Sequence, residues 1–272
     1  MRIVYIFFII VNFCLLSALE MKTVESLGTG ESNLVLLTSA ESLIINPAFL
    51  SNIGFGYNRE VLDTQQKGFD YYNLEMYTIG SFGYGTVKYK DKNSGDQFSV
   101  SLYGLGMQVK DNMKWGVTLE NIDSQSSGNQ YQTWSTKIGM NYVLASPVNM
   151  LLGITLENLF KDNSETVNKN FPPVFGVGIG FLPNDNLLWT HALSYRRQEG
   201  EAVHYKTGFS LLLDKNLVFT GGINENGYTT GIEVPLAFGK AVKLGKISCS
   251  MLLPYSIKQD IIYYLSYTFG YM

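Results

Sequence analysis

Apolar residues recur at every second position in many separate runs of this 272-residue chain. Within residues 134–144, for example, Trp134, Ile138 and Tyr142 lie on one phase, and Lys137 and Gly139 lie on the other. A period of two places the two sets on opposite faces of a β-strand, because successive side chains point to opposite sides. Beyond the N-terminal apolar run no stretch has a comparably clean period of 3.6 residues. The pattern therefore predicts an all-β fold.

Short clusters of Asn, Asp, Pro and Gly separate these runs, as at 183–186 and 224–227. Such residues favour turns. They divide the chain into fourteen expected strands, an even number, as a closed single-chain barrel requires. The expected strands cover about 52–60, 69–80, 83–91, 96–109, 113–122, 130–144, 149–160, 173–182, 187–198, 201–213, 216–224, 228–238, 246–254 and 259–272. In the fourth of these the apolar phase changes after Leu102, which predicts a bulge near Gly104.

The N-terminus has the order of features found in a secretory signal peptide. Arg2 supplies a positive charge, residues 3–16 form an apolar run, and the small residues Ser17 and Ala18 follow. The run is shorter than the roughly 20 apolar residues that a spanning helix needs. We therefore expect residues 1–18 to be removed. Only Cys249 then remains, so we expect no disulfide, and the net charge of −3 argues against a nucleic-acid partner.

Glycine and aromatic residues favour a membrane barrel over a soluble β-sandwich or solenoid, which are the alternatives. Glycine lies mostly on the polar phase, and we interpret this as a barrel interior in which side-chain bulk is optional. Aromatic residues such as Trp115, Trp189 and Tyr255 lie near strand ends, as in the aromatic girdles at membrane interfaces. We predict a transmembrane antiparallel barrel of about fourteen strands over residues 52–272, surrounded by outer-membrane lipid.

The segment 19–51 is apolar but has no clean alternation. Residues 39–43 could form a short helix that Pro47 ends nearby. A segment this apolar is not expected to remain in water. We expect it to pack into one end of the barrel as a hatch, with Asn46, Pro47 and Ala48 as its anchor.

Several short motifs occur in a characteristic order. They are 38–50, with Asn46-Pro47-Ala48 before the first expected strand, then 158–159 with 171–173, 216–217 with 221–224, and 254–256. In these features the chain resembles the FadL-type outer-membrane proteins, and the PorV/PorQ branch most closely. The resemblance implies a fourteen-stranded barrel with an inward-folded N-terminal hatch. It also implies transport of hydrophobic compounds in one branch and type IX protein secretion in the PorV branch.

Residues for catalysis or metal binding are sparse. Neither His191 nor His204 lies near a cysteine or a suitably spaced carboxylate, and no nucleophile–base pair is apparent. We therefore predict neither enzymatic activity nor a metal or cofactor site. His191 shares a face with Trp189 and Leu193, which indicates an interfacial or packed side chain.

Charged residues on the polar phase are better candidates, because charges at membrane depth must face a lumen or pair with each other. These lumen-facing candidates are Glu120, Lys137, Glu157, Arg196, Lys206 and Glu233. They could serve a substrate or simply brace the barrel with salt bridges. Three functions stay open at this point. The first, which the resemblance favours, is type IX-type secretion or surface anchoring with secretion-machinery proteins as partners. The others are a channel for hydrophobic small molecules such as fatty acids, and a structural barrel without substrate.

Overall fold

The computed structural model describes residues 29, 32, 34–35, 40–52, 55–62, 69–91, 97–126, 129–144, 149–159, 172–197, 202–214, 217–238, 242–255 and 261–271. The expected signal peptide lies outside these residues, as does much of the expected hatch segment. Among the described residues no helix is long and apolar enough to cross a membrane.

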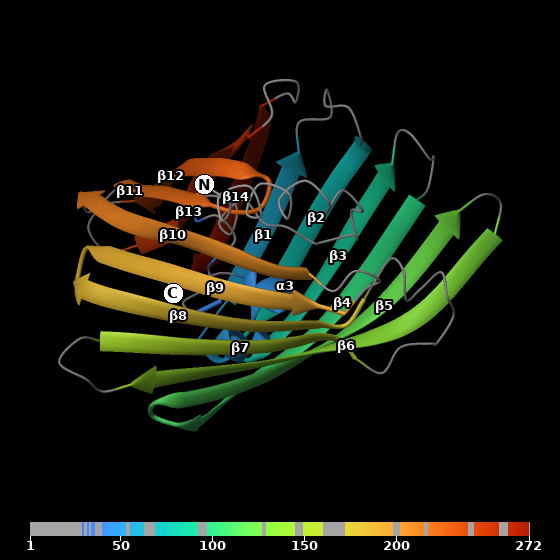
Figure 1. Ribbon diagram of the computed structural model, residues 1–272, viewed down its shortest axis with the longest axis horizontal. Helices are drawn as coiled ribbons and strands as arrows, with labels where there is room; N and C mark the ends of the chain where they lie inside the picture. Colours follow the sequence, from blue (N-terminus) through green and yellow to red (C-terminus); the bar gives the residue numbers. More distant parts are fainter. Residues whose placement is uncertain are drawn as a thin grey trace, which may run out of the picture.

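The described residues form fourteen antiparallel strands, each paired with its neighbours in sequence, and β1 pairs with β14 to close the barrel (Figure 1). This confirms the predicted all-β barrel. The strands are β1 (Phe55–Leu62), β2 (Phe69–Ile79), β3 (Phe82–Asp91), β4 (Gln97–Lys110), β5 (Met113–Ser126), β6 (Asn129–Leu144), β7 (Asn149–Leu159), β8 (Val174–Asn184), β9 (Leu187–Arg196), β10 (Ala202–Asp214), β11 (Leu217–Ile223), β12 (Gly227–Phe238), β13 (Val242–Pro254) and β14 (Ile262–Tyr271).

Within the part of the chain that the structure describes, two short helical elements precede the barrel, α3 (Ser42–Ile45) and η1 (Pro47–Asn52). The helix expected over 39–43 therefore lies slightly later in the chain, and Pro47 begins a separate 3₁₀ segment directly after it. Figure 1 shows α3 inside the barrel, surrounded by the strands. The interior packing of this N-terminal segment agrees with the expectation from its apolar composition.

The prediction of a bulge near Gly104 is wrong. Strands β4 and β5 pair without interruption from Gln97 to Gln108, and the register shifts only between Gln108 and Lys110. Burial alternates evenly along β4, so Leu102 points inward and Tyr103 points outward. The apolar phase changed in the sequence because both faces of this strand are apolar. The outer face carries exposed apolar side chains, and the inner face shares a buried apolar cluster with the N-terminal segment.

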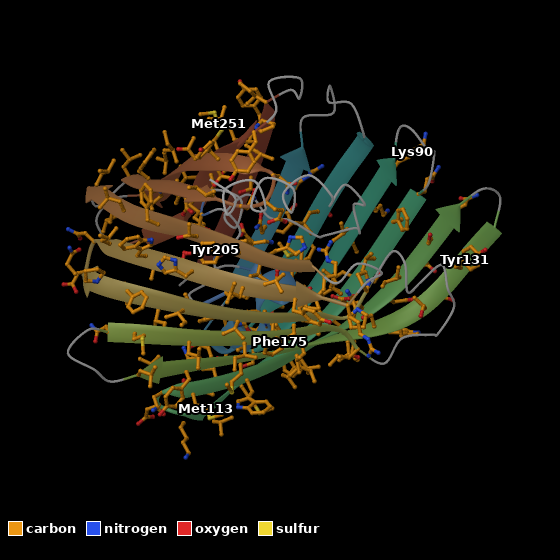
Figure 2. The ribbon with its side chains drawn as sticks, viewed as in Figure 1. Lys90, Met113, Tyr131, Phe175, Tyr205 and Met251 are labelled. Carbon is orange, nitrogen blue, oxygen red and sulfur yellow. The ribbon has the colours of Figure 1, made fainter. Side chains whose placement is uncertain are left out.

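The outer surface of the barrel is apolar around most of its circumference. Large apolar side chains are exposed there, among them Phe175 and Tyr205 (Figure 2), and Val203 reaches an exposed fraction of 67%. Aromatic rings also contact each other across strands, as do Tyr84 and Tyr103 with ring centroids 5.4 Å apart. Soluble monomers rarely expose apolar patches of this extent. The outer surface is therefore suited to a hydrocarbon environment.

The two ends of the barrel differ in their connections. At the end where Met113 lies, short turns join the strands, including Gly80 with a φ of 58° between β2 and β3 (Figure 2). Most connections at the opposite end, where Lys90 and Tyr131 lie, are longer, such as 160–173, although two residues separate β5 from β6. Short turns are typical of the periplasmic end of an outer-membrane barrel. Because η1 leads directly into β1 at the short-turn end, the hatch enters the barrel from that side.

Candidate functional site

The N-terminal segment follows the inner wall of the barrel as a belt. Its described residues, 29, 32, 34–35 and 40–52, approach successive strands in turn, and we call these residues the hatch. Thr29 lies against β10, and the Ser32 hydroxyl is 2.5 Å from the Thr190 hydroxyl of β9. Val35 contacts β8, whereas Pro47 contacts β5. The hatch therefore spans much of the wall and is not a plug held at one point.

Glycines of the wall make this close approach possible. A Cβ added to Gly116 of β5 would lie 2.1 Å from the Pro47 carbonyl oxygen, and one on Gly208 would lie 2.0 Å from the Thr29 carbonyl oxygen. Atoms cannot approach so closely, so only a residue without a side chain fits beneath the hatch backbone. The interpretation that side-chain bulk is optional at these positions was wrong, because glycine is required where the two backbones touch.

Wall side chains bind the last carbonyls of helix α3. The Thr118 hydroxyl donates a hydrogen bond to the Leu43 carbonyl oxygen at 2.9 Å, and the Lys137 ammonium donates one to the Ile44 carbonyl oxygen. The final carbonyls of a helix have no partner within the helix, and a cation near them is favourable. The wall thus supplies the missing donors, one of them charged.

Asn46 holds the centre of the hatch motif. Its side chain is completely buried, and its amide nitrogen donates to the Leu34 carbonyl oxygen at 2.9 Å and to the Met140 carbonyl oxygen of β6 at 3.4 Å. Its amide oxygen accepts from the Ala48 amide at 3.2 Å. Asn46 thus joins two parts of the hatch to the wall, while Pro47 lies against β5.

Three of the six charged candidates lie together on neighbouring strands. Lys137 of β6 is 3% exposed, and its Nζ lies 3.3 Å from Oε2 of Glu157 on β7. Glu120 of β5 is 1% exposed, and the charges of Lys137 and Glu157 both act on it. Its Oε1 has no hydrogen-bond partner within the described part of the chain. We call these three residues the charged triad.

The other three charged candidates lie elsewhere. The Nζ of Lys206 is 3.9 Å from Oε1 of Glu225, and Glu233 forms a 2.9 Å ion pair with Lys246 across β12 and β13. Arg196 is half-buried at the end of β9. Lys206 and Glu233 thus form ion pairs on strands remote from the triad in sequence, whereas Lys137 of the triad binds the hatch.

The inner wall has an apolar side and a polar side. Strands β2 to β5 carry most of the buried apolar side chains, which form one cluster with the hatch: Ala40, Leu43, Ile44, Leu50, Leu74, Met76, Val87, Phe98, Val100, Leu102 and Ile122. Strands β9 to β14 carry mainly buried hydroxyl groups: Thr190, Thr220, Thr229, Ser248, Ser250 and Ser266. An apolar molecule would therefore be accommodated best beside β2 to β5, where the hatch now packs.

His191 lies on the outer face of β9. Its ring is 5.4 Å from the ring of Trp189, and its Nδ1 lies 2.7 Å from the Tyr205 hydroxyl. This agrees with the packed side chain that the sequence indicated. Among the described residues no group of three His, Cys, Asp or Glu side chains is placed to hold a metal ion.

Comparison with known proteins gives a likeness in structure alone. No family model matches the sequence, and no curated protein matches it. The toluene transporter TbuX of Ralstonia pickettii has a TM-score of 0.63 at 12% identity, over 93% of this chain and 99% of that one. A FadL homologue of Pseudomonas aeruginosa has a TM-score of 0.60 at 8% identity, over 94% of this chain and 100% of the homologue. The fold is that of the FadL-type barrels.

A third solved structure with this fold is a mutant of the monoaromatic hydrocarbon channel TodX. It has a TM-score of 0.67 at 12% identity, over 94% of this chain and 100% of that one. The likeness extends over almost the whole of each chain. It does not distinguish the PorV/PorQ branch, for which the sequence motifs remain the evidence.

Proposed function

We propose that this chain is a FadL-type channel of the outer membrane that passes small hydrophobic molecules. The observation that carries the proposal is the apolar cluster between the hatch and strands β2 to β5. Two of the solved structures with this fold are described as a toluene transporter and a monoaromatic hydrocarbon channel. The apolar outer surface suits a membrane position, and the short-turn end suits the periplasmic side.

The hatch covers the apolar wall in the structure. With the hatch seated, Leu43 and Leu50 cover side chains such as Leu102 and Met76. If part of the hatch moves aside, an apolar molecule can replace it without exposing that wall to water. The free energy gained is about 25 cal/mol for each Å² of apolar surface kept from water. A polar solute gains nothing there. The wall therefore selects for hydrophobic molecules.

Uptake by whole cells tests this proposal. A Gram-negative host lacking its own channels for hydrophobic compounds would carry the full chain, and the uptake of radiolabelled toluene would be measured. Expression should speed uptake, and Leu102→Gln on the apolar wall should slow it again. Thr229→Gln, an inward substitution on the polar side, is the matched control and should leave uptake unchanged. Uptake equal to that of cells without the protein would refute the channel and favour a structural barrel.

The PorV/PorQ resemblance would instead assign the barrel to type IX protein secretion. That assignment rests on the sequence motifs alone. A pull-down from solubilised membranes distinguishes the two functions. Recovery of secretion-machinery proteins, together with normal toluene uptake in a strain lacking this barrel, would favour secretion over transport.

A further inference from the structure

The charged triad is more than an ion pair that braces the wall, because it also touches the hatch. Lys137 Nζ lies between two acceptors, the Ile44 carbonyl oxygen of the hatch and the Glu157 carboxylate of the neighbouring strand. Within the described part of the chain, Lys137 is therefore the triad member that donates a hydrogen bond to the hatch, the part of the protein that must move. We propose that Lys137 is a latch that holds the hatch closed and that Glu120 receives its ammonium group when the hatch leaves.

Glu120 is placed to receive the ammonium group of Lys137. This carboxylate is almost completely buried on β5, next to β6, and its Oε1 has no hydrogen-bond partner among the described residues. A buried carboxylate oxygen without a partner is costly. In the closed state that cost persists, because the lysine is engaged by Ile44. Loss of the Ile44 contact frees one ammonium hydrogen, and Glu120 Oε1 is the acceptor left to take it.

The triad thus gives Lys137 two arrangements that differ in one hydrogen bond. Such a pair of states is what a gate needs, because a small bias can shift the population from one to the other. Thr118 cannot act in this way, since its uncharged hydroxyl donates its one hydrogen to the Leu43 carbonyl oxygen of the hatch. This inference rests on the proposed function in one respect, because passage of a molecule is the reason for the hatch to open. The latch itself is a property of the hatch and the wall.

The test measures hatch release directly, without any substrate. Ala48 of the hatch is completely buried in the closed state, and the full chain with Cys249→Ser and Ala48→Cys carries a reporter thiol on the hatch, where it faces the wall. The rate at which a water-soluble maleimide labels this thiol in the purified, detergent-solubilised barrel follows the population of the released hatch. A thiol at the exposed end position, Lys110→Cys, gives the reference rate.

Lys137→Met should raise the labelling rate about tenfold, because the hatch loses a charge-assisted hydrogen bond. Glu120→Gln should lower it about threefold or more, because the released lysine loses its charged acceptor. In the double variant the Glu120 substitution should have no further effect, since no ammonium group remains. Ser124→Ala, which removes another buried inward polar group of β5, should leave the rate unchanged.

The opposite signs distinguish a latch from a brace. If Glu120→Gln raises the rate as Lys137→Met does, the triad merely stabilises the wall and the proposal is overturned. An unchanged rate in Lys137→Met also overturns it. Both results are independent of toluene uptake, so the latch and the channel function can fail separately.

Discussion

Replacing Gly116 with alanine should unseat the hatch. The new methyl group would lie 2.1 Å from the Pro47 carbonyl oxygen and 2.5 Å from the Ala48 amide nitrogen, and both are backbone atoms that no side-chain rotation can move. Overpacking of this kind costs about 1–3 kcal/mol. A value of about 2 kcal/mol raises the ratio of unseated to seated hatch roughly 30-fold, because ~1.4 kcal/mol corresponds to a factor of ten.

Single-channel recording in planar bilayers measures this effect. The variant should spend a roughly 30-fold larger share of the time in a high-conductance state, while its heat-modifiable mobility on gels shows that the barrel is still folded. Gly83→Ala is the matched control on the same inner face. Its methyl group would meet the flexible ends of Leu43 and Leu50, at 3.0 and 3.2 Å, and Thr78 Cγ2 at an ordinary 3.6 Å. If Gly116→Ala and Gly83→Ala spend the same share of time in the high-conductance state, the close backbone contact at Gly116 does not hold the hatch in place.

Three further predictions concern other parts of the chain. Asn46→Ala should speed hydrogen exchange of the hatch by a factor of roughly ten or more, since buried carbonyls lose their donor; unchanged exchange by mass spectrometry would contradict this. Cysteine at Lys137 should react with a water-soluble maleimide once residues 24–44 are deleted, whereas cysteine at Ile138 should stay protected by lipid, and equal labelling would refute the assigned faces. Mass spectrometry of the membrane fraction should find the first 18 residues removed, and an intact N-terminus would refute the signal peptide.

The strands could be predicted from the sequence because a period of two is a local signal. All fourteen expected ranges overlap observed strands. The error at β4 has a physical cause: Phe98 and Leu102 belong to the buried apolar cluster that includes hatch residues, whereas Tyr103 and Met107 are apolar side chains exposed on the outer face. Alternation reports which residues share a face. It does not report what that face touches.

The site was only partly predictable. The alternation phase identified Lys137 and Glu157, which lie 3.3 Å apart in the structure. It could not identify Thr118 or Asn141, because their acceptors are backbone carbonyls of the hatch, 75 and 106 residues away in sequence. A backbone carbonyl has no sequence signature. The one available signal was glycine on the inner phase of consecutive strands, and it was interpreted as a barrel interior in which side-chain bulk is optional.

The belt also constrains the order in which the molecule can be assembled. The hatch precedes β1 in the chain, yet it lies against strands as distant as β10, and the wall closes only when β14 pairs with β1. Once that seam has formed, the hatch is enclosed on every side and continuous with the first strand. A hatch that is not in place when this seam forms can enter only through an end of the closed barrel, which is the reverse of the release that the latch controls.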